Sequence, residues 1–244
     1  ARIELLEPKL NSYITILRDS ALKQAKEHEA EIIGGSYRGP LHGVPVSLKD
    51  IFYVTGVPNT YGSKINKDFI PRFNSTVVNK FADAGAVLMG KLNLHQFAFG
   101  PTGENHHYGD MHNPWDVDSY AGGSSGGSGS AVAAGQTTIA MGSDTGGSIR
   151  IPSALCGIVG LKPTFGRVSK YGVNPLAWSL DHVGPMVRTV KDAALVLNSI
   201  AGYDQRDLCS VNLPVPDFTA GLSGDIKGIR IGVPKEYFDF PVHP

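Results

Sequence analysis

Two serines lie in glycine-rich segments whose composition suits covalent catalysis. Ser124 lies in Gly122–Ser128 (GGSSGGS), and Ser148 lies in Gly142–Arg150 (GSDTGGSIR). A serine hydroxyl is a weak nucleophile that attacks a carbonyl carbon when a base removes its proton. Backbone N–H groups of consecutive glycines can point into a cavity and stabilise the oxyanion that this attack creates. The two segments therefore predict nucleophilic catalysis by a serine beside an oxyanion hole.

Lys49 is the best-placed base for such a serine. A lysine can accept a proton when burial lowers its pKa enough to leave the amine neutral. Lys49 follows the apolar segment 44–48, whereas no histidine in the chain has a comparably constrained setting. The second serine segment also carries Asp144 and Arg150, which can pair and hold the loop.

Glycine is concentrated around these serines. The chain of 244 residues contains 30 glycines, and nine of them lie between Gly122 and Gly147. A flexible Gly/Ser linker could have this composition. The apolar segments 131–134 and 138–141 lie among and after these glycines and are typical of packed elements. We therefore expect the glycines to form ordered loops within a domain.

Three other patterns fit their chemistry less well. Gly85–Leu92 (GAVLMGKL) is close to a phosphate-binding P-loop, but Leu92 occupies the position of the Ser or Thr that binds magnesium. Residues 122–126 contain G-x-S-x-G, but residues 113–120 read as a loop, whereas the nucleophile elbow of α/β-hydrolases follows a strand. The histidines lack the spacing of common metal motifs; those considered are His95, His106, His107 and His112. We expect no metal and no cofactor.

Charge and hydropathy exclude several classes of protein. The chain has 22 basic and 22 acidic residues, so it lacks the positive footprint of a nucleic-acid binder. No run of 18 apolar residues is present, and no signal-like stretch opens the sequence, so a cytoplasmic location is expected. Two cysteines, Cys156 and Cys209, do not make a disulfide scaffold.

Strands and helices alternate along the chain. Helices are predicted over 19–33, 76–84, 128–134 and 189–200, and strands over 12–17, 44–49, 86–89, 138–141 and 229–233. Pro8 is expected to break an earlier helical piece, and Asp19 to cap the helix that ends near residue 33. This order predicts an α/β fold with a mixed, largely parallel β-sheet covered by helices on both faces. Residues 1–244 are expected to form one domain, incomplete at its C-terminus.

These segments resemble the amidase signature family. Gly122–Ser128 and Gly142–Arg150 match its signature almost residue for residue, and Gly43–Asp50 (GVPVSLKD) is similar to its lysine motif. Residues 157–163 (GIVGLKP) and 166–169 also match. The resemblance covers nearly all of this chain and implies the N-terminal part of the amidase signature fold.

The resemblance implies a Ser–Ser–Lys triad that cleaves a carboxylic amide through an acyl-enzyme. Ser148 would be the nucleophile, Ser124 the bridging serine after a cis Gly123–Ser124 peptide bond, and Lys49 the base. The oxyanion hole would consist of backbone N–H groups of the loop that ends at Ser148, namely those of Thr145, Gly146 and Gly147. The loop would be supported by three further residues, Ser125, Asp144 and Arg150.

Two branches of the family remain open. A free-standing amidase would act on a small-molecule amide, with a homodimer as one option. The glutaminase component of glutamyl-tRNA(Gln) amidotransferase would release ammonia from glutamine for partner subunits. Ile151-Pro152, where the second branch is expected to carry Gln-Pro, favours the first branch, as do residues 94–97 and 176–182. A third hypothesis is a non-catalytic scaffold fragment, but the presence of all three triad residues argues against it. Neither a membrane nor direct nucleic-acid contact is expected.

Overall fold

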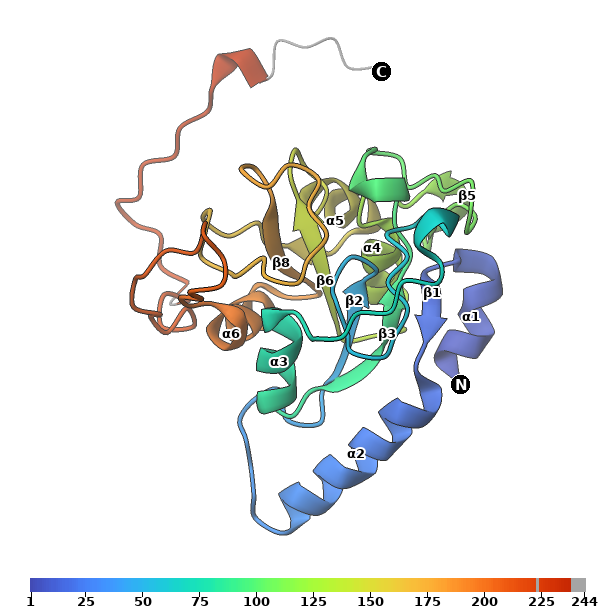
Figure 1. Cartoon of the computed structure of the whole chain (residues 1–244). Helices are drawn as coiled ribbons and strands as arrows, with labels where there is room; N and C mark the ends of the chain where they lie inside the picture. Colours follow the sequence, from blue (N-terminus) through green and yellow to red (C-terminus); the bar gives the residue numbers. More distant parts are fainter. Residues whose placement is uncertain (223, 238–244) are drawn as a thin grey trace.

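A six-stranded mixed β-sheet organises the chain in the computed structural model, which describes residues 1–222 and 224–237 (Figure 1). The strands lie in the order β1 (Tyr13–Ile16), β3 (Val87–Leu92), β2 (Pro45–Lys49), β6 (Ile139–Asp144), β8 (His182–Val187) and β7 (Val159–Gly160). The central strands β3, β2 and β6 are parallel. Strand β1 pairs antiparallel with β3 and β8 pairs antiparallel with β6, while β7 pairs antiparallel with β8 and so runs in the direction of the central strands.

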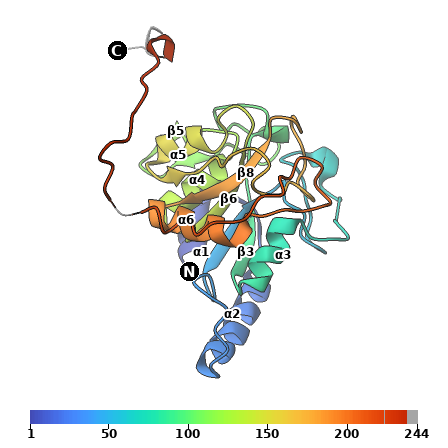
Figure 2. The same ribbon diagram turned by 90° about the vertical axis from the view of Figure 1, so that its left-hand side faces the viewer.

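Helices cover both faces of this sheet. The helices α3 (Thr76–Asp83) and α6 (Val190–Ile200) pack on one face, which is turned to the viewer in Figure 2. The other face carries α1 (Arg2–Leu10), α4 (Gly126–Ala133) and α5 (Arg150–Cys156), while α2 (Arg18–Ile33) runs along β3. The predicted α/β fold, with helices on both faces of a mixed, largely parallel sheet, is confirmed, and its parallel strands are the central ones.

Side-chain alternation in β6 explains how one strand serves both faces. Ile139 and Met141 pack with α3 and α6, whereas Ala140 between them packs with α4. Successive side chains of a strand point to opposite faces, so a strand buried on both faces must be apolar throughout. The short apolar run that predicted this strand is therefore the signature of a central position in the sheet.

Local capping signals fix where the two helices on the first face begin. Ser75 Oγ accepts a hydrogen bond from the Val78 N–H at 3.4 Å and begins α3. Thr189 Oγ1 accepts one from the Asp192 N–H at 3.1 Å and begins α6. Such caps satisfy N–H groups that have no partner inside the helix, which is why the predicted starts of these helices are correct.

The N-terminal helices differ from the prediction. Pro8 lies inside α1, because burial of Ile3 and Leu10 holds this short helix against the core and proline removes only one N–H donor. Asp19 lies in the first turn of α2 and does not cap it; the N-cap position is Leu17, with no side-chain hydrogen bond.

Two segments elsewhere also differ. Residues 113–120 are not a loop, since β4 (His112–Asn113) and β5 (Asp116–Tyr120) form an antiparallel pair outside the main sheet. All five residues of β5 are exposed, so no buried face marked this strand in the sequence. Residues 229–233 form no strand, because their apolar side chains, including Ile231 at 77% exposure, have no partner strand in the described chain.

Two further features bear on the composition. Cys156 is buried and Cys209 is half-buried, and both are free thiols. None of the helices in the described part of the chain has the length and apolar character that a membrane span requires.

Lys91, in the segment that is close to a P-loop, forms a buried ion pair with Asp50. Lys91 lies in strand β3, and its Nζ donates to Asp50 Oδ1 at 2.6 Å and to Asn59 Oδ1 at 3.0 Å. The other carboxylate oxygen of Asp50 accepts from the Thr60 N–H and hydroxyl at 2.9 and 2.6 Å. Both charged side chains are completely buried. The lysine therefore neutralises Asp50 within the core.

We expect the substitution Lys91→Met to lower the free energy of unfolding by about 3–5 kcal/mol, because it leaves the buried Asp50 carboxylate without its cation. Urea denaturation followed by circular dichroism measures this loss. The double substitution with Asp50→Asn removes both charges and should recover part of the stability. A loss below about 1 kcal/mol for Lys91→Met, in the range of exposed ion pairs, would contradict a buried pair.

Candidate active site

The candidate site lies where two neighbouring parallel strands end. Strands β2 and β6 pair in register from Val46 and Ile139 onward, so their C-terminal ends reach the same edge of the sheet. Lys49 is the last residue of β2, and Ser143 and Asp144 are the last residues of β6. Polar side chains at these positions leave the apolar core together. This edge is where open α/β sheets bind ligands.

The Lys49 amine lies among three serine hydroxyls. Its Nζ donates hydrogen bonds to Ser124 Oγ at 2.7 Å, Ser125 Oγ at 2.9 Å and Ser143 Oγ at 3.0 Å. The side chains of Lys49, Ser124 and Ser125 are fully buried. Ser143 is not among the site residues that the sequence predicted. Its only local signal is a hydroxyl residue at the end of an apolar strand, one position before Asp144.

Burial brings the pKa of the Lys49 amine close to neutral pH. Removal from water lowers the pKa of Lys49 to about 7, and the negative charges of Asp144 and Asp181 oppose this shift. No carboxylate hydrogen bond to the amine is present among the described residues; its partners are hydroxyls. A large fraction of Lys49 is therefore neutral at pH 7 and able to accept a proton.

The glycine-rich segment before α4 brings two of these serines to Lys49. The Gly123–Ser124 peptide bond is cis, and the Ser124 carbonyl accepts from the His95 N–H at 3.0 Å. Gly127, in the first turn of α4, packs so closely that a Cβ there would lie 2.4 Å from the Ser12 carbonyl oxygen. The Ser125 N–H donates to the Ser148 carbonyl at 3.2 Å, so the two signature segments contact each other directly.

Ser148 opens into a cavity of about 620 Å³. The backbone of residues 145–147 lines this cavity together with Ser148, and the wall includes His95, Glu104 and the apolar side chains of Phe99, Ile151, Leu176 and Leu180. Ser148 is half-buried, and within the described chain its hydroxyl makes no hydrogen bond to another protein group. The structure therefore gathers the hydroxyls of Ser124 and Ser125 around the Lys49 amine, and it places Ser148 on the wall of the cavity.

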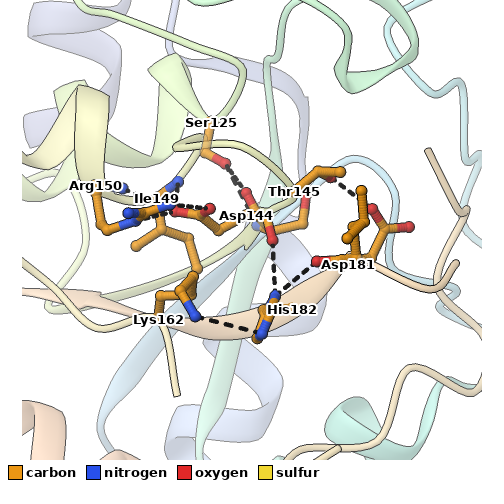
Figure 3. A network of polar contacts seen from close by, with 10 residues as sticks. Ser125, Asp144, Thr145, Ile149, Arg150, Lys162, Asp181 and His182 are labelled. Carbon is orange, nitrogen blue, oxygen red and sulfur yellow. Dashed lines mark hydrogen bonds and ion pairs between the residues drawn. The ribbon is translucent and has the colours of Figure 1, made fainter. Parts of the chain in front are cut away.

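The Asp144 carboxylate fixes the backbone after Ser148 (Figure 3). It accepts from Arg150 Nε at 3.0 Å and Nη2 at 2.9 Å, and from the N–H groups of Ile149 at 3.1 Å and Arg150 at 3.3 Å. Burial by itself raises the pKa of Asp144, but these donors outweigh it and hold the pKa below its ordinary value. Asp144 and Arg150 thus pair as the sequence suggested, in the bidentate geometry that fixes a guanidinium.

The loop before Ser148 offers a matched pair of glycines. Gly147 has φ of +144°, and a Cβ there would lie 2.7 Å from Ile151 Cδ1, whereas a Cβ on Gly146 meets nothing within 4 Å. We expect Gly147→Ala to shift this loop and to lower kcat for amide hydrolysis by about 10²-fold, the cost of roughly 1 Å of misplacement. Gly146→Ala should lower kcat far less. Steady-state kinetics of both variants test this, and equal losses would show that the loop geometry is not critical.

Among the described residues, the four histidines weighed in the sequence form no group with metal-ligand spacing, whereas a different set of three side chains could together hold a metal ion. The structure instead brings together His28, His42 and Glu31, with Glu31 Oε2 lying 3.4 Å from His28 Nδ1 and 2.9 Å from His42 Nε2. The Arg38 N–H donates to His42 Nδ1 at 3.2 Å. That bond leaves the proton of a neutral His42 on Nε2, where it is donated to Glu31. This cluster therefore forms a hydrogen-bonded anchor between α2 and the following loop.

The fold and site thus define an α/β protein with a mixed sheet and a buried lysine held among serine hydroxyls at its edge. The family model described as Amidase matches residues 1–244, so the chain belongs to this family. It is 52% identical to a glutamyl-tRNA(Gln) amidotransferase component of Carboxydothermus hydrogenoformans over 97% of this chain and 49% of that protein. The chain spans about half the length of the curated relatives it matches.

Solved structures agree with this assignment. A chain from a vestigial protein complex connected with the origins of an s-triazine catabolic enzyme has a TM-score of 0.91 at 41% identity, over 94% of this chain and 50% of that one. The peptide amidase of Stenotrophomonas maltophilia has a TM-score of 0.85 at 41% identity, over 90% of this chain and 47% of that one. The family resemblance seen in the sequence is confirmed.

Proposed function

We propose that this chain carries the catalytic Ser–Ser–Lys triad of an enzyme that hydrolyses carboxylic amides. The observation that carries the proposal is the fully buried Lys49 amine, which has a lowered pKa and lies 2.7 Å from Ser124 Oγ. A buried lysine without a carboxylate partner is costly to fold. Its presence beside a cavity lined by a serine fits a base rather than a structural cation.

The proposed reaction begins with proton transfer away from Ser148. Neutral Lys49 accepts a proton from Ser124, Ser124 accepts one from Ser148, and Ser148 Oγ attacks the amide carbonyl carbon. Backbone N–H groups of residues 145–147 stabilise the resulting oxyanion. The C–N bond then breaks as the relay returns a proton to the leaving nitrogen. Water, deprotonated by the same relay, hydrolyses the acyl-enzyme and restores Ser148.

The cavity favours a small amide with an apolar or uncharged acyl group. Its wall is largely apolar, and Ile151, next to the loop of Ser148, presents an alkyl side chain there. The similarity in fold to a peptide amidase supports this reading. Glutamine is the second candidate, and it is supported by the 52% identity to a component of glutamyl-tRNA(Gln) amidotransferase. With glutamine the enzyme would supply ammonia to partner subunits.

We further propose that residues 1–244 belong to a single amidase domain, that the enzyme is cytoplasmic, and that its reaction needs no cofactor. A free-standing amidase would act as a monomer or homodimer. The amidotransferase reading requires other subunits.

Ammonia release from benzamide, propionamide and glutamine by the intact enzyme, with and without candidate partner subunits, tests the proposal. A higher kcat/KM for the simple amides supports the free-standing amidase, and glutaminase activity that rises with partner subunits supports the second candidate. Absence of Ser148-dependent turnover of every amide would refute the enzymatic reading and favour a non-catalytic scaffold.

A further inference from the structure

Asp181 lies beside the loop of Ser148 because of the register of two strands. Strand β8 pairs antiparallel with β6, and Asp144 lies opposite His182. The residue before His182 is therefore brought next to the residue after Asp144, which is Thr145. The sequence separates Thr145 and Asp181 by 36 positions. Only this antiparallel register makes them neighbours.

The Asp181 carboxylate binds two segments at once. Its Oδ1 accepts from Thr145 Oγ1 at 2.5 Å (Figure 3). Its Oδ2 accepts from the Leu176 N–H at 2.9 Å, and the Ala177 N–H lies 3.1 Å from both oxygens. Asp181 is only 7% exposed, so these donors replace most of its contact with water.

The two segments that Asp181 joins both belong to the cavity of Ser148. Thr145 begins the loop whose N–H groups are proposed to stabilise the oxyanion. Leu176 and Leu180, from the segment that Asp181 organises, form part of the cavity wall. His182 adds a second link, because its Nδ1–H points to the Leu180 carbonyl at 2.7 Å and to the Asp144 carbonyl at 3.2 Å.

A carboxylate therefore holds each end of the loop. Asp144 binds the backbone that follows Ser148, and Asp181 binds the side chain that begins the loop. An oxyanion hole is effective only when its donors are fixed before the reaction. The central glycines, Gly146 and Gly147, contribute no side chain to fix it. Side-chain contacts that fix this loop are therefore at its ends, beside the backbone hydrogen bond that the Gly147 carbonyl accepts from the Ile151 N–H at 2.7 Å.

We propose that Asp181 is a positioning residue for amide hydrolysis, which fixes the start of the oxyanion loop through Thr145 and joins it to the cavity wall. This inference rests on the proposed function. Asp181 does not touch the reacting atoms and acts through Thr145 and the backbone of residues 176–177. It is not among the site residues that the sequence predicted.

The substitutions Asp181→Asn and Thr145→Val, alone and combined, test this role in the intact enzyme. Asparagine cannot accept at both positions, so it loses at least one N–H partner of residues 176–177 or the Thr145 hydroxyl. Valine has nearly the shape of threonine and removes only the hydroxyl. The readout is kcat per reactive Ser148, with the reactive sites counted by phenylmethylsulfonyl fluoride labelling and mass spectrometry. Counting sites in this way separates misplacement of the loop from loss of folded protein.

Asp204→Asn is the matched control. Asp204 is also 7% exposed and accepts from Ser169 Oγ at 2.8 Å and Arg206 Nε at 2.9 Å, away from the cavity of Ser148. This control should lower the urea midpoint while leaving kcat per reactive Ser148 within about twofold, because neither Asp204 nor these two partners line the cavity of Ser148.

We expect each of Asp181→Asn and Thr145→Val to lower kcat per reactive Ser148 by about 10- to 100-fold. Because both substitutions break the same link, the double variant should be little less active than the less active of the two single variants. Asp181→Asn should also raise KM, since it loosens the cavity wall, whereas Thr145→Val should not. Strictly multiplicative losses, or an Asp181→Asn enzyme with unchanged kcat per reactive site, would overturn this inference while leaving the proposed function intact. A wild type without Ser148-dependent turnover would overturn both.

Discussion

The substitution Ser148→Ala is expected to lower kcat for amide hydrolysis by at least about 10⁴-fold. The variant retains the cavity and the N–H groups of residues 145–147, so binding and oxyanion stabilisation remain, but no acyl-enzyme can form. In serine hydrolases such remnants leave roughly 10³- to 10⁴-fold catalysis over water. Residual activity should therefore be detectable but should show no burst.

Covalent labelling by phenylmethylsulfonyl fluoride provides a second test that Ser148 is the nucleophile. A single adduct on the peptide that contains Ser148 is expected in the wild type, and no adduct in Ser148→Ala. Ser153→Ala is a fitting control, because the Ser153 hydroxyl is buried in α5 and has no hydrogen-bond partner in the described chain. It should keep full labelling and full activity. An adduct on Ser124 in the wild type would reassign the nucleophile.

The substitution Lys49→Met is expected to lower kcat by about 10³- to 10⁴-fold, because loss of the base leaves both serine hydroxyls protonated. Lys49→Arg should be equally inactive, since a guanidinium keeps its proton at all accessible pH values. A urea midpoint for Lys49→Met at or above that of the wild type would show that the loss is catalytic. Retention of more than about a tenth of the activity, well above what loss of a general base leaves, would exclude Lys49 as the base.

The pH profile of the wild type provides a second test of Lys49. The neutral amine is the active form, so kcat/KM should rise with pH, by a factor of about ten per pH unit well below the pKa, and level off above about pH 7. A profile that stays flat between pH 5 and 8 would contradict this assignment.

The same pKa shift has a consequence for stability. The unfolded chain keeps a proton on Lys49 up to its ordinary pKa of 10.5, whereas the folded chain releases it near pH 7. Between these values the unfolded state binds more protons, so this residue makes the protein more stable as the pH rises. Lys49→Met should remove that contribution, which urea denaturation at pH 7 and pH 10 would detect.

The sequence by itself predicted the chemical groups of the proposed site. Lys49, Ser124 and Ser148 stand beside glycine or at the end of an apolar strand, and Asp144 and Arg150 lie only six positions apart. Features of this kind are local: a strand of apolar residues, or a helix cap such as Ser75. Each follows from interactions between residues near one another in the chain, which a single sequence displays directly.

The tertiary structure alone decided which distant residues join them. Ser143 reaches Lys49, and Asp181 reaches Thr145, only because β6 pairs parallel with β2 on one side and antiparallel with β8 on the other. The helix containing Pro8 exists because its apolar residues find a core to pack against, while residues 229–233 have strand-like composition but no partner strand in the described chain. Strand order and register depend on the free energy of the whole packed sheet, and no short segment of the sequence contains that information.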